Sequence, residues 1–302
     1  MSHRSRILVV GDIITDVVAV LSGPLATGSD TAAEIRFSGG GQAANTAAWI
    51  AAQGVGVTLV GAVGDDEAGR DRVAELTGIG VDCAVERHEG YPTGTVIVLT
   101  ADGERTMVSQ RGANLRLSAV HVDRALAGAP DVGHLHLSAY TLLDAASRGA
   151  GLRALAAARE RGLTTSVDAA SAASAAPLRR VGTAAFLTWV RDVDLLLVNT
   201  DEATVLTGGL DPAAQARALS AAARRVVVKR GAAGAVWVDR EATVSVAAAR
   251  RVAVVDVTGA GDAFAAGLLT AWLAGADPRA ALDRAADLGA TAVATVGARP
   301  TP

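Results

Sequence analysis

The sequence predicts an α/β fold in which a central, mostly parallel β-sheet is covered by helices on both faces. Two observations lead to this prediction. Short apolar runs rich in β-branched residues alternate with Ala-rich amphipathic segments, which is typical of a parallel sheet buried on both sides. Two stretches, at about residues 15–37 and 94–110, break the alternation and predict a small additional sheet.

The expected core strands are short, and the segments between them are long enough for the crossover helices that parallel strands need. The strands are expected at Ile7–Val10, Val57–Val60, Leu135–Leu137, Thr164–Val167, Leu195–Val198 and Val226–Val228. The helices are expected at Ala43–Gln53, Glu67–Gly78, Ala145–Arg161 and Pro212–Arg224. This order of elements indicates an α/β architecture.

The second irregular stretch predicts a β-hairpin, because Thr95–Thr100 and Arg105–Ser109 flank the turn Ala101–Glu104. Both irregular stretches leave the core and return to it. We therefore expect them to pair as a small sheet that covers one edge of a cleft and serves as a lid. Neither a repeat nor a Pro- or Ser-rich linker divides the chain. Residues 1–302 are expected to form a single domain with this lid.

The composition narrows the class of protein. Half of the 302 residues are hydrophobic and a fifth are charged, which is enough for a large buried core. The formal charge of −3, without a dense Lys/Arg run, disfavours a nucleic-acid partner. Apolar stretches are interrupted before they reach the roughly 18 residues of a membrane span. The single cysteine excludes an internal disulfide, and without a long apolar signal core a cytoplasmic protein is expected.

The run Asp256–Asp262 carries the strongest chemical signal, because it precedes a predicted helix that reaches about residue 273. The small residues Gly259, Ala260 and Gly261 allow the backbone to approach a ligand, and N–H groups at a helix N-terminus stabilise charge on a transferring phosphoryl group. Asp262 is placed to accept the proton of an attacking hydroxyl, as a general base. The alternative is that Asp262 only caps the helix.

A second glycine-rich run lies near the N-terminus, from Phe37 to Ala47. Its glycines, including Gly40 and Gly41, would let the backbone approach a polyol, and Asn45 offers both a donor and an acceptor to sugar hydroxyls. The alternative is a helix-starting turn with Asn45 exposed.

Together the two runs resemble the signatures of the ribokinase-like, or phosphofructokinase-B type, carbohydrate kinases, and the resemblance extends over nearly the whole chain. It implies a three-layer α/β/α ribokinase-like fold and ATP-dependent phosphorylation of a hydroxyl on a small sugar or polyol. It also implies that Asp262 is the base and that the backbone of Gly259–Gly261 forms an anion hole.

The resemblance assigns acceptor-binding residues at the end of the first strand. In an open α/β sheet the carboxyl ends of the strands face the ligand crevice, and Asp12 and Asp16 follow Ile7–Val10 directly. By resemblance Asp16 holds a sugar hydroxyl. Asp12 lies near the same place, but it could equally be a solvated acid at a strand end.

The nucleotide side of the site is implied by two further elements. Asn199 and Glu202 look like the Asn-x-x-Glu element that organises phosphate, magnesium and water, with Glu202 acting through water because Mg2+ keeps several waters. The alternative for Glu202 is an acid that interacts with the helix dipole. Lys229, Gly231 and Gly234 resemble the loop that seats ATP, although an ordinary hairpin would read the same way.

A monovalent-cation loop, for K+, is implied by resemblance to ribokinase. Its expected residues are Asp256, Thr258, Ala292, Thr295, Gly297 and Thr301. Cofactors are thus ATP, Mg2+ and K+. Family members often dimerise through the lid, and the apolar residues Val96–Val98 would support a homodimer here.

The acceptor remains open at this stage. Ile14 stands where ribokinase carries a hydroxyl-binding Asn, and Ser138 stands where its sugar-contacting Glu would lie. A nucleoside kinase of the same fold is one alternative, and a non-catalytic sugar or nucleotide sensor is another. His134 and His136 alternate on a predicted strand without a third ligand at metal spacing, so packing is the favoured interpretation.

Overall fold

The computed structural model describes residues 6–101, 104–170, 176–209, 211–239, 243–246 and 251–300. The two central residues of the predicted hairpin turn, Asp102 and Gly103, and the predicted cation ligand Thr301 lie outside these ranges. In the described ranges, no helix combines the length and apolar character needed to cross a membrane.

The predicted fold class is confirmed by a nine-stranded central sheet. Its strand order is β13-β12-β11-β10-β9-β8-β1-β4-β5. The strands are β1 (Arg6–Val10), β4 (Val57–Gly64), β5 (Asp82–His88), β8 (Val132–Ser138), β9 (Thr164–Asp168), β10 (Leu195–Asn199), β11 (Val226–Lys229), β12 (Ala235–Val238) and β13 (Thr243–Val246). Neighbours pair in parallel from β5 to β11, and β12 and β13 pair antiparallel. All six predicted core strands are present.

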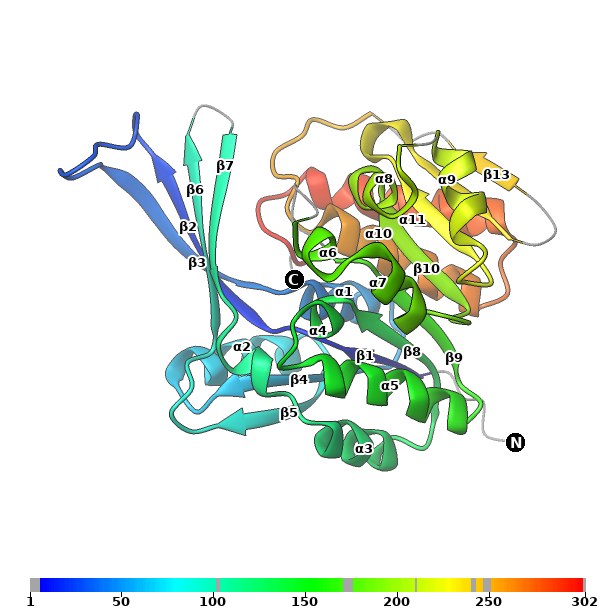
Figure 1. Ribbon diagram of the computed structural model, residues 1–302. Helices are drawn as coiled ribbons and strands as arrows, with labels where there is room; N and C mark the ends of the chain where they lie inside the picture. The colour runs from blue at the N-terminus through cyan, green and yellow to red at the C-terminus, as the bar shows by residue number, and fades with distance from the viewer. Residues whose placement is uncertain are drawn as a thin grey trace.

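Helices cover both faces of this sheet and enclose two apolar clusters (Figure 1). One face carries α1 (Gln42–Ala51), α2 (Glu67–Gly78), α10 (Ala260–Leu273) and α11 (Pro278–Val293). The other carries α3 (Ala119–Gly128), α4 (Tyr140–Leu143), α5 (Arg148–Glu160), α6 (Ala176–Val181), α7 (Thr183–Trp189), α8 (Thr200–Thr207) and α9 (Pro212–Leu219). Short 3-10 turns lie at η1 (Gly112–Arg116) and η2 (Gly231–Ala233).

The four predicted helices are present, with ends that shift by a few residues. Helix α2 matches its predicted bounds, whereas α9 ends at Leu219 rather than at Arg224. The cause is a tertiary contact: Ala223 forms a parallel bridge with Val193, just before β10 and β11 begin to pair. The chain at Ala223 therefore pairs with Val193 rather than continuing the helix.

Both irregular stretches pair in a separate four-stranded sheet, as predicted. Its order is β3-β2-β6-β7, formed by β2 (Ile14–Leu21), β3 (Ala33–Gly40), β6 (Gly94–Ala101) and β7 (Glu104–Gln110). Strands β6 and β7 form the expected antiparallel hairpin, and β2 joins the two stretches by pairing parallel with β6. Figure 1 shows this small sheet projecting from one side of the core.

The order of strands locates the crevice of the central sheet. After β1 the chain adds β4 on one side and later β8 on the other, so the direction of winding reverses at β1. Ligands of open α/β sheets bind outside the carboxyl ends of the strands at such a switch point. Asp12, Asp168, Asn199 and Lys229 lie at the carboxyl ends of β1, β9, β10 and β11.

Two buried histidines lie within the central sheet. The Nδ1 atom of His134 lies 2.8 Å from Thr164 Oγ1 and its Nε2 atom lies 2.7 Å from Ser166 Oγ. His136 Nδ1 lies 2.8 Å from the same Ser166 oxygen. Burial lowers the pKa of His134 to about 3 and that of His136 to about 4. Both rings are therefore neutral in the folded protein.

Substituting His136→Asn is expected to make folding less sensitive to acid. The pKa of His136 is lower in the folded protein than in the unfolded chain, so the unfolded chain takes up a proton first as the pH drops. The free energy of unfolding therefore falls between about pH 6.5 and pH 4. For one histidine the loss is at most about 1.4 kcal/mol per pH unit. Urea unfolding at pH 7.5, 6 and 5 measures this. The difference in free energy of unfolding between wild type and His136→Asn should narrow or reverse as the pH falls. If the free energies of both proteins change with pH in parallel, the explanation is wrong.

Candidate active site

The expected helix after the Asp256–Asp262 run is α10, and Gly259 is its N-cap. Gly259 has φ 76°, and a Cβ atom there would clash with the backbone of Ala298. Glycine therefore allows the C-terminal tail to pack against the start of the helix. Ala260 N donates to Val257 O at 3.3 Å. The first turn of a helix leaves N–H groups without helical partners, and an anion site at this helix start stays a prediction.

Asp262 lies in the first turn of α10, but it is not the cap residue, because Gly259 occupies that position. Burial raises the pKa of Asp262 to about 8, and the negative charges of Asp168 and Asp12 act in the same direction. A hydrogen bond from Asn45 and the charge of Lys229 oppose this rise. A carboxyl group that titrates near neutral pH is suited to remove a proton from a hydroxyl.

Asn45 is buried on α1, with only 4% of its surface exposed. Its Nδ2 atom donates to Asp262 Oδ2 at 2.9 Å, and its Oδ1 atom accepts from Arg299 Nε at 3.2 Å. The alternative of an exposed Asn45 is therefore wrong. Gly41, the N-cap of α1, adopts φ 95° and packs against the backbone of Asp12. The two glycine-rich runs are thus joined by the hydrogen bond between Asn45 of one run and Asp262 of the other.

Asp16 lies on β2, with its carboxylate directly over Gly40. A Cβ atom on Gly40 would clash with both carboxylate oxygens, so this glycine is required by the position of Asp16. Burial raises the pKa of Asp16 to about 6. Asp16 and Gly40, two of the residues that the sequence assigned to the acceptor side, are thus brought together.

Asp12 is buried and fully engaged. Its Oδ1 atom accepts from Ala43 N at 3.3 Å and from Ser138 Oγ at 3.4 Å. Its Oδ2 atom lies 3.3 Å from Arg111 Nη2. The Arg111 guanidinium also lies 4.1 Å above the centre of the Tyr140 ring. The interpretation of Asp12 as a solvated acid is wrong, and Arg111 is a cation of the site that the sequence did not single out.

Lys229, at the end of β11, pairs with Asp168, an acid that the sequence did not single out. Its Nζ atom donates to Asp168 Oδ2 at 2.6 Å, and Asp168 is 1% exposed. Burial disfavours the charged ammonium, but Asp168, Glu202 and Asp262 outweigh it and raise the pKa of Lys229. A Cβ atom on Gly261 would lie 3.7 Å from Nζ, so the ammonium lies beside the start of α10.

Asn199 and Glu202 form a reciprocal capping box at the start of α8. Glu202 N donates to Asn199 Oδ1 at 2.8 Å, and the Asn199 backbone and side-chain nitrogens donate to Glu202 Oε2 and Oε1 at 2.7 and 2.9 Å. Both carboxylate oxygens are therefore occupied, which fits an action on Mg2+ through water better than direct ligation. No group of three metal-binding side chains occurs among the described residues.

The expected turn after β11 is present. Gly231 and Gly234 bracket η2, Arg230 N donates to Gly234 O at 2.7 Å, and β11 and β12 pair antiparallel. The turn lies directly after Lys229. The predicted nucleotide-side residues therefore lie along the carboxyl ends of β10 and β11.

The predicted cation loop is only partly assembled around Asp256. Asp256 Oδ1 accepts from Thr258 N at 2.9 Å and Thr258 Oγ1 at 2.7 Å, and its Oδ2 accepts from Gly297 N at 3.0 Å. Ala292 and Thr295 lie at the end of α11, where Thr295 Oγ1 donates to Ala292 O at 3.1 Å. With the Asp256 oxygens engaged in this way, a cation would rely mainly on backbone carbonyl groups.

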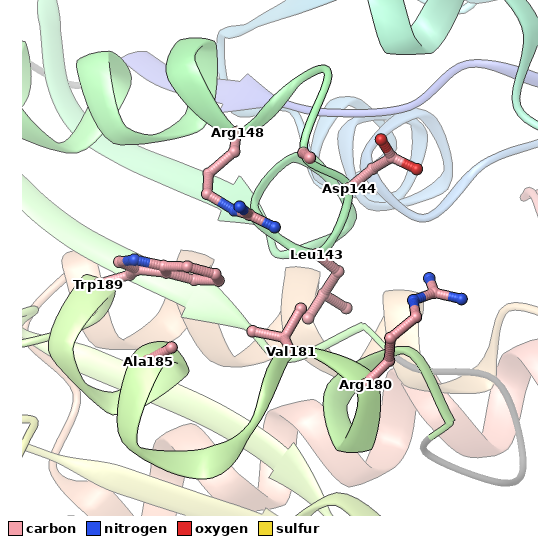
Figure 2. Close-up of a pocket in the computed structure, with 8 residues that line it drawn as sticks. Leu143, Asp144, Arg148, Arg180, Val181, Ala185 and Trp189 are labelled. Carbon is pink, nitrogen blue, oxygen red and sulfur yellow. The ribbon is translucent and has the colours of Figure 1, made fainter.

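A pocket of about 650 Å3 lies elsewhere, between the loop after α4 and helices α6 and α7. Figure 2 shows Arg148 beside the Trp189 ring, with Asp144 and Arg180 on the opposite side of the pocket. Arg148 Cζ lies 4.4 Å from the Trp189 ring centre, and its Nε atom donates to Leu142 O at 2.8 Å. None of the predicted site residues lines this pocket.

The geometry gathers the parts that phosphoryl transfer to a hydroxyl requires. A buried carboxyl group with a near-neutral pKa lies at a helix N-terminus, beside a buried ammonium group. Such preorganised donors and charges stabilise a transferring phosphoryl group, whereas the base accepts the proton of the acceptor.

Comparisons with known proteins agree with this arrangement. A family model described as pfkB family carbohydrate kinase matches residues 4–302. The chain is 31% identical over 300 residues to an ATP-dependent ribose-1-phosphate kinase from Halopiger xanaduensis, covering 98% of this chain and 95% of that protein. It is 32% identical over 299 residues to a 2-dehydro-3-deoxygluconokinase from Thermoproteus tenax, covering 96% and 89%.

The fold is also similar to that of a solved structure. A putative ribokinase II from E. coli, in complex with ATP and Mg2+, superimposes with a TM-score of 0.85 at 23% sequence identity, covering 97% of this chain and 94% of that chain. This similarity confirms the ribokinase-like fold.

Proposed function

The chain belongs to the pfkB family of carbohydrate kinases, and on this premise we propose that it transfers the γ-phosphoryl group of ATP to a hydroxyl of a small sugar or sugar-like polyol. The observation that carries the proposal is Asp262, a carboxyl group with a pKa near 8 at the N-terminus of α10, held by Asn45. Lys229 lies beside the same helix start.

In the proposed reaction, Asp262 accepts the proton of the acceptor hydroxyl. The hydroxyl oxygen forms a bond to the γ-phosphorus as the bond to the bridging oxygen of ADP breaks. N–H groups at Gly259–Gly261 and the Lys229 ammonium stabilise the charge on the transferring group. The acceptor is held by Asp16, Gly40 and neighbouring groups of Asp12, Gly41 and Asn45, and the small sheet covers it as a lid.

ATP is proposed to lie along Asn199, Lys229 and the Gly231–Gly234 turn. Glu202 would hold Mg2+ through water, and the ion would supply positive charge to offset that of the phosphates. The Asp256 loop, with carbonyl groups near Ala292, Thr295 and Gly297, is the proposed place for K+, together with Thr258 and Thr301.

The acceptor class is proposed from Arg111. The guanidinium is fixed by Asp12 and Tyr140 near the residues assigned to the acceptor, so it can attract a negatively charged group there. The two relatives named above are kinases of a sugar phosphate and of a dehydro-deoxygluconate. We therefore place sugar phosphates and sugar acids first among the acceptors to test.

The deciding experiment is ADP release by the purified protein with a panel of acceptors, in Mg2+, with K+ or with Na+ in its place. The panel contains sugar phosphates, sugar acids, neutral pentoses and hexoses, and nucleosides. Turnover with a sugar-based acceptor supports the proposal, and turnover only with nucleosides would replace it by a nucleoside kinase. Binding of ATP without turnover on any acceptor would favour a sensor. Equal rates in K+ and Na+ would remove the K+ assignment.

A homodimer through the small sheet is proposed from an exposed apolar row. Phe37, Val17, Ile97 and Val108 are register partners across all four strands and share one face. Phe37 is 71% exposed, Val108 56% and Ile97 41%. A row of this kind is typical of a surface covered by a partner, and a second copy presents a complementary one.

Substituting Phe37→Asp is expected to convert the dimer into a monomer, because an unpaired carboxylate would be buried where the most exposed side chain of the row meets the partner. Sedimentation velocity over a concentration series measures this. The matched control is Met107→Asp, an exposed residue on the opposite face of the same sheet, which should leave the dimer intact. A wild-type protein that is monomeric throughout would contradict the interface.

A further inference from the structure

We propose that Arg299 is a positioning residue that fixes the side-chain amide of Asn45 so that its NH2 group, rather than its oxygen, faces Asp262. This inference rests on the proposed function, in which Asp262 is the base. The three side chains form a chain of hydrogen bonds, from Arg299 Nε to Asn45 Oδ1 at 3.2 Å and from Asn45 Nδ2 to Asp262 Oδ2 at 2.9 Å.

The chain has a fixed direction because of the chemistry of its first member. An amide side chain can rotate by 180° with little change of shape and thereby exchange its oxygen with its nitrogen. A guanidinium has only donors, so Arg299 can face only the oxygen of Asn45. The nitrogen of the same amide must then point to Asp262.

Arg299 is held firmly enough to do this. Its Nη2 atom donates to Gly40 O at 3.0 Å, and its Nη1 atom lies 3.3 Å from Glu75 Oε2 on α2. A Cβ atom on Gly39 would clash with the guanidinium, so the glycine-rich run leaves room for it. The side chain is 12% exposed, and burial lowers the pKa of Arg299 to about 10. Even this value keeps the guanidinium charged at neutral pH.

The direction of the amide matters for the state of the base. An NH2 donor stabilises the ionised carboxylate of Asp262, which is the form that accepts a proton, whereas a reversed amide would favour the protonated acid. The other charged groups around Asp262 are Asp168, Lys229 and Asp12, and they lie on other elements. Around Arg299 they are Glu75, Arg72 and Asp16, with the Cys83 thiol also near.

The test compares Arg299→Met and Arg299→Lys with wild type over a range of pH. For both variants we expect kcat to fall roughly 10- to 100-fold near pH 7, with the KM for acceptor changed much less. The acidic limb of the kcat profile should move up by about one pH unit, since the ionised base loses its orienting donor. Lysine should fail because one ammonium cannot span Gly40, Asn45 and Glu75 together.

The matched control is Arg284→Met. Arg284, on α11, bonds to Gln53, which follows the C-terminal end of α1 and so lies beyond the end of that helix remote from Asn45. It should keep the kcat and pH profile of wild type. If Arg299→Met fails to fold, Arg299→Lys decides. A folded Arg299 variant with wild-type kcat and an unmoved acidic limb would overturn the inference while leaving the kinase proposal intact.

A direct titration separates this inference from the proposed function. Carbon-13 NMR of aspartate carboxyl groups, with the Asp262 signal assigned from Asp262→Asn, gives the pKa of Asp262 without any turnover. We expect a higher pKa in the Arg299 variants than in wild type. If wild type phosphorylates no acceptor, the proposed function fails, and an unchanged Asp262 pKa in the variants would then reject the role of Arg299 as well.

Discussion

Asp262→Asn is expected to lower kcat by a factor of roughly 10²–10⁴ while ATP and acceptor still bind. The change removes the proton acceptor but retains the volume of the side chain and an oxygen that can accept the hydrogen bond from Asn45. Steady-state kinetics with the acceptor identified in the panel, together with calorimetric binding of ATP, measures both effects.

The matched control is Asp201→Asn, an exposed acid in the first turn of another helix, α8, which should keep wild-type kcat. A turnover number for Asp262→Asn within tenfold of wild type would remove Asp262 from the role of base.

The same variant should gain stability at alkaline pH. The pKa of Asp262 is raised to about 8 in the folded protein, above its ordinary value of 3.8. Wild type therefore loses stability, relative to Asp262→Asn, as the pH rises from about 4 through 8, because the folded protein resists ionisation. Melting temperatures at pH 5, 7 and 9 should show an increasing advantage for the variant. At pH 9 we expect a difference of a few degrees, which corresponds to at least about 1 kcal/mol in the free energy of unfolding. A constant difference would contradict the raised pKa.

Lys229→Met is expected to destabilise the fold by about 3–5 kcal/mol, because it leaves Asp168 as a buried carboxylate without its cation. Asp168 is 1% exposed, and Lys229 Nζ is its 2.6 Å partner. Urea unfolding measures the loss. In any protein that remains folded, the KM for ATP should also rise, since the ammonium group lies beside the start of α10.

The double variant Asp168→Asn with Lys229→Met separates the two effects of this change. It removes the unpaired carboxylate, so most of the stability should return while the defect with ATP remains. If Lys229→Met alone keeps wild-type stability, the ion pair does not support the fold in the way described. If the double variant regains wild-type kinetics with ATP, Lys229 has no role on the nucleotide side.

The sequence predicted well those parts of the fold that depend on local pattern. The core strands, the hairpin of β6 and β7 and the start of α10 follow from periodicity, turn residues and glycines near each other in the chain. The end of α9 was placed too late, because the bridge between Val193 and Ala223 is tertiary and has no local signal. The place of Asp262 at a glycine-rich helix start suggested a general base, and the family resemblance strengthened that role and supplied the role of Asn199, which spacing alone would not assign.

The partners of the site residues were beyond sequence reasoning. Asn45 was expected to offer its amide to sugar hydroxyls, which stays a prediction, but the bonds of that amide to Asp262 and Arg299, 217 and 254 positions away in the chain, had no signal in the sequence. Asp168 is the last residue of β9 and lies 61 positions before Lys229. A strand-end acid was a visible signal, but pairing at such separations depends on the order of strands in the sheet, which periodicity does not give.

The packing of the tail against α10 has a consequence for the order in which the protein matures during synthesis. The strands and helices that precede α10 leave the ribosome first and can begin to fold. Ala298, however, contacts both Gly259 and Trp49, whose Nε1 atom donates to Ala298 O at 3.0 Å, and Arg299 follows it. In a nascent chain without these residues, Gly259 and Trp49 lack their contacts with Ala298, and Asn45 lacks its bond from Arg299. Phosphoryl transfer is therefore expected to begin only after the whole of this region has been translated.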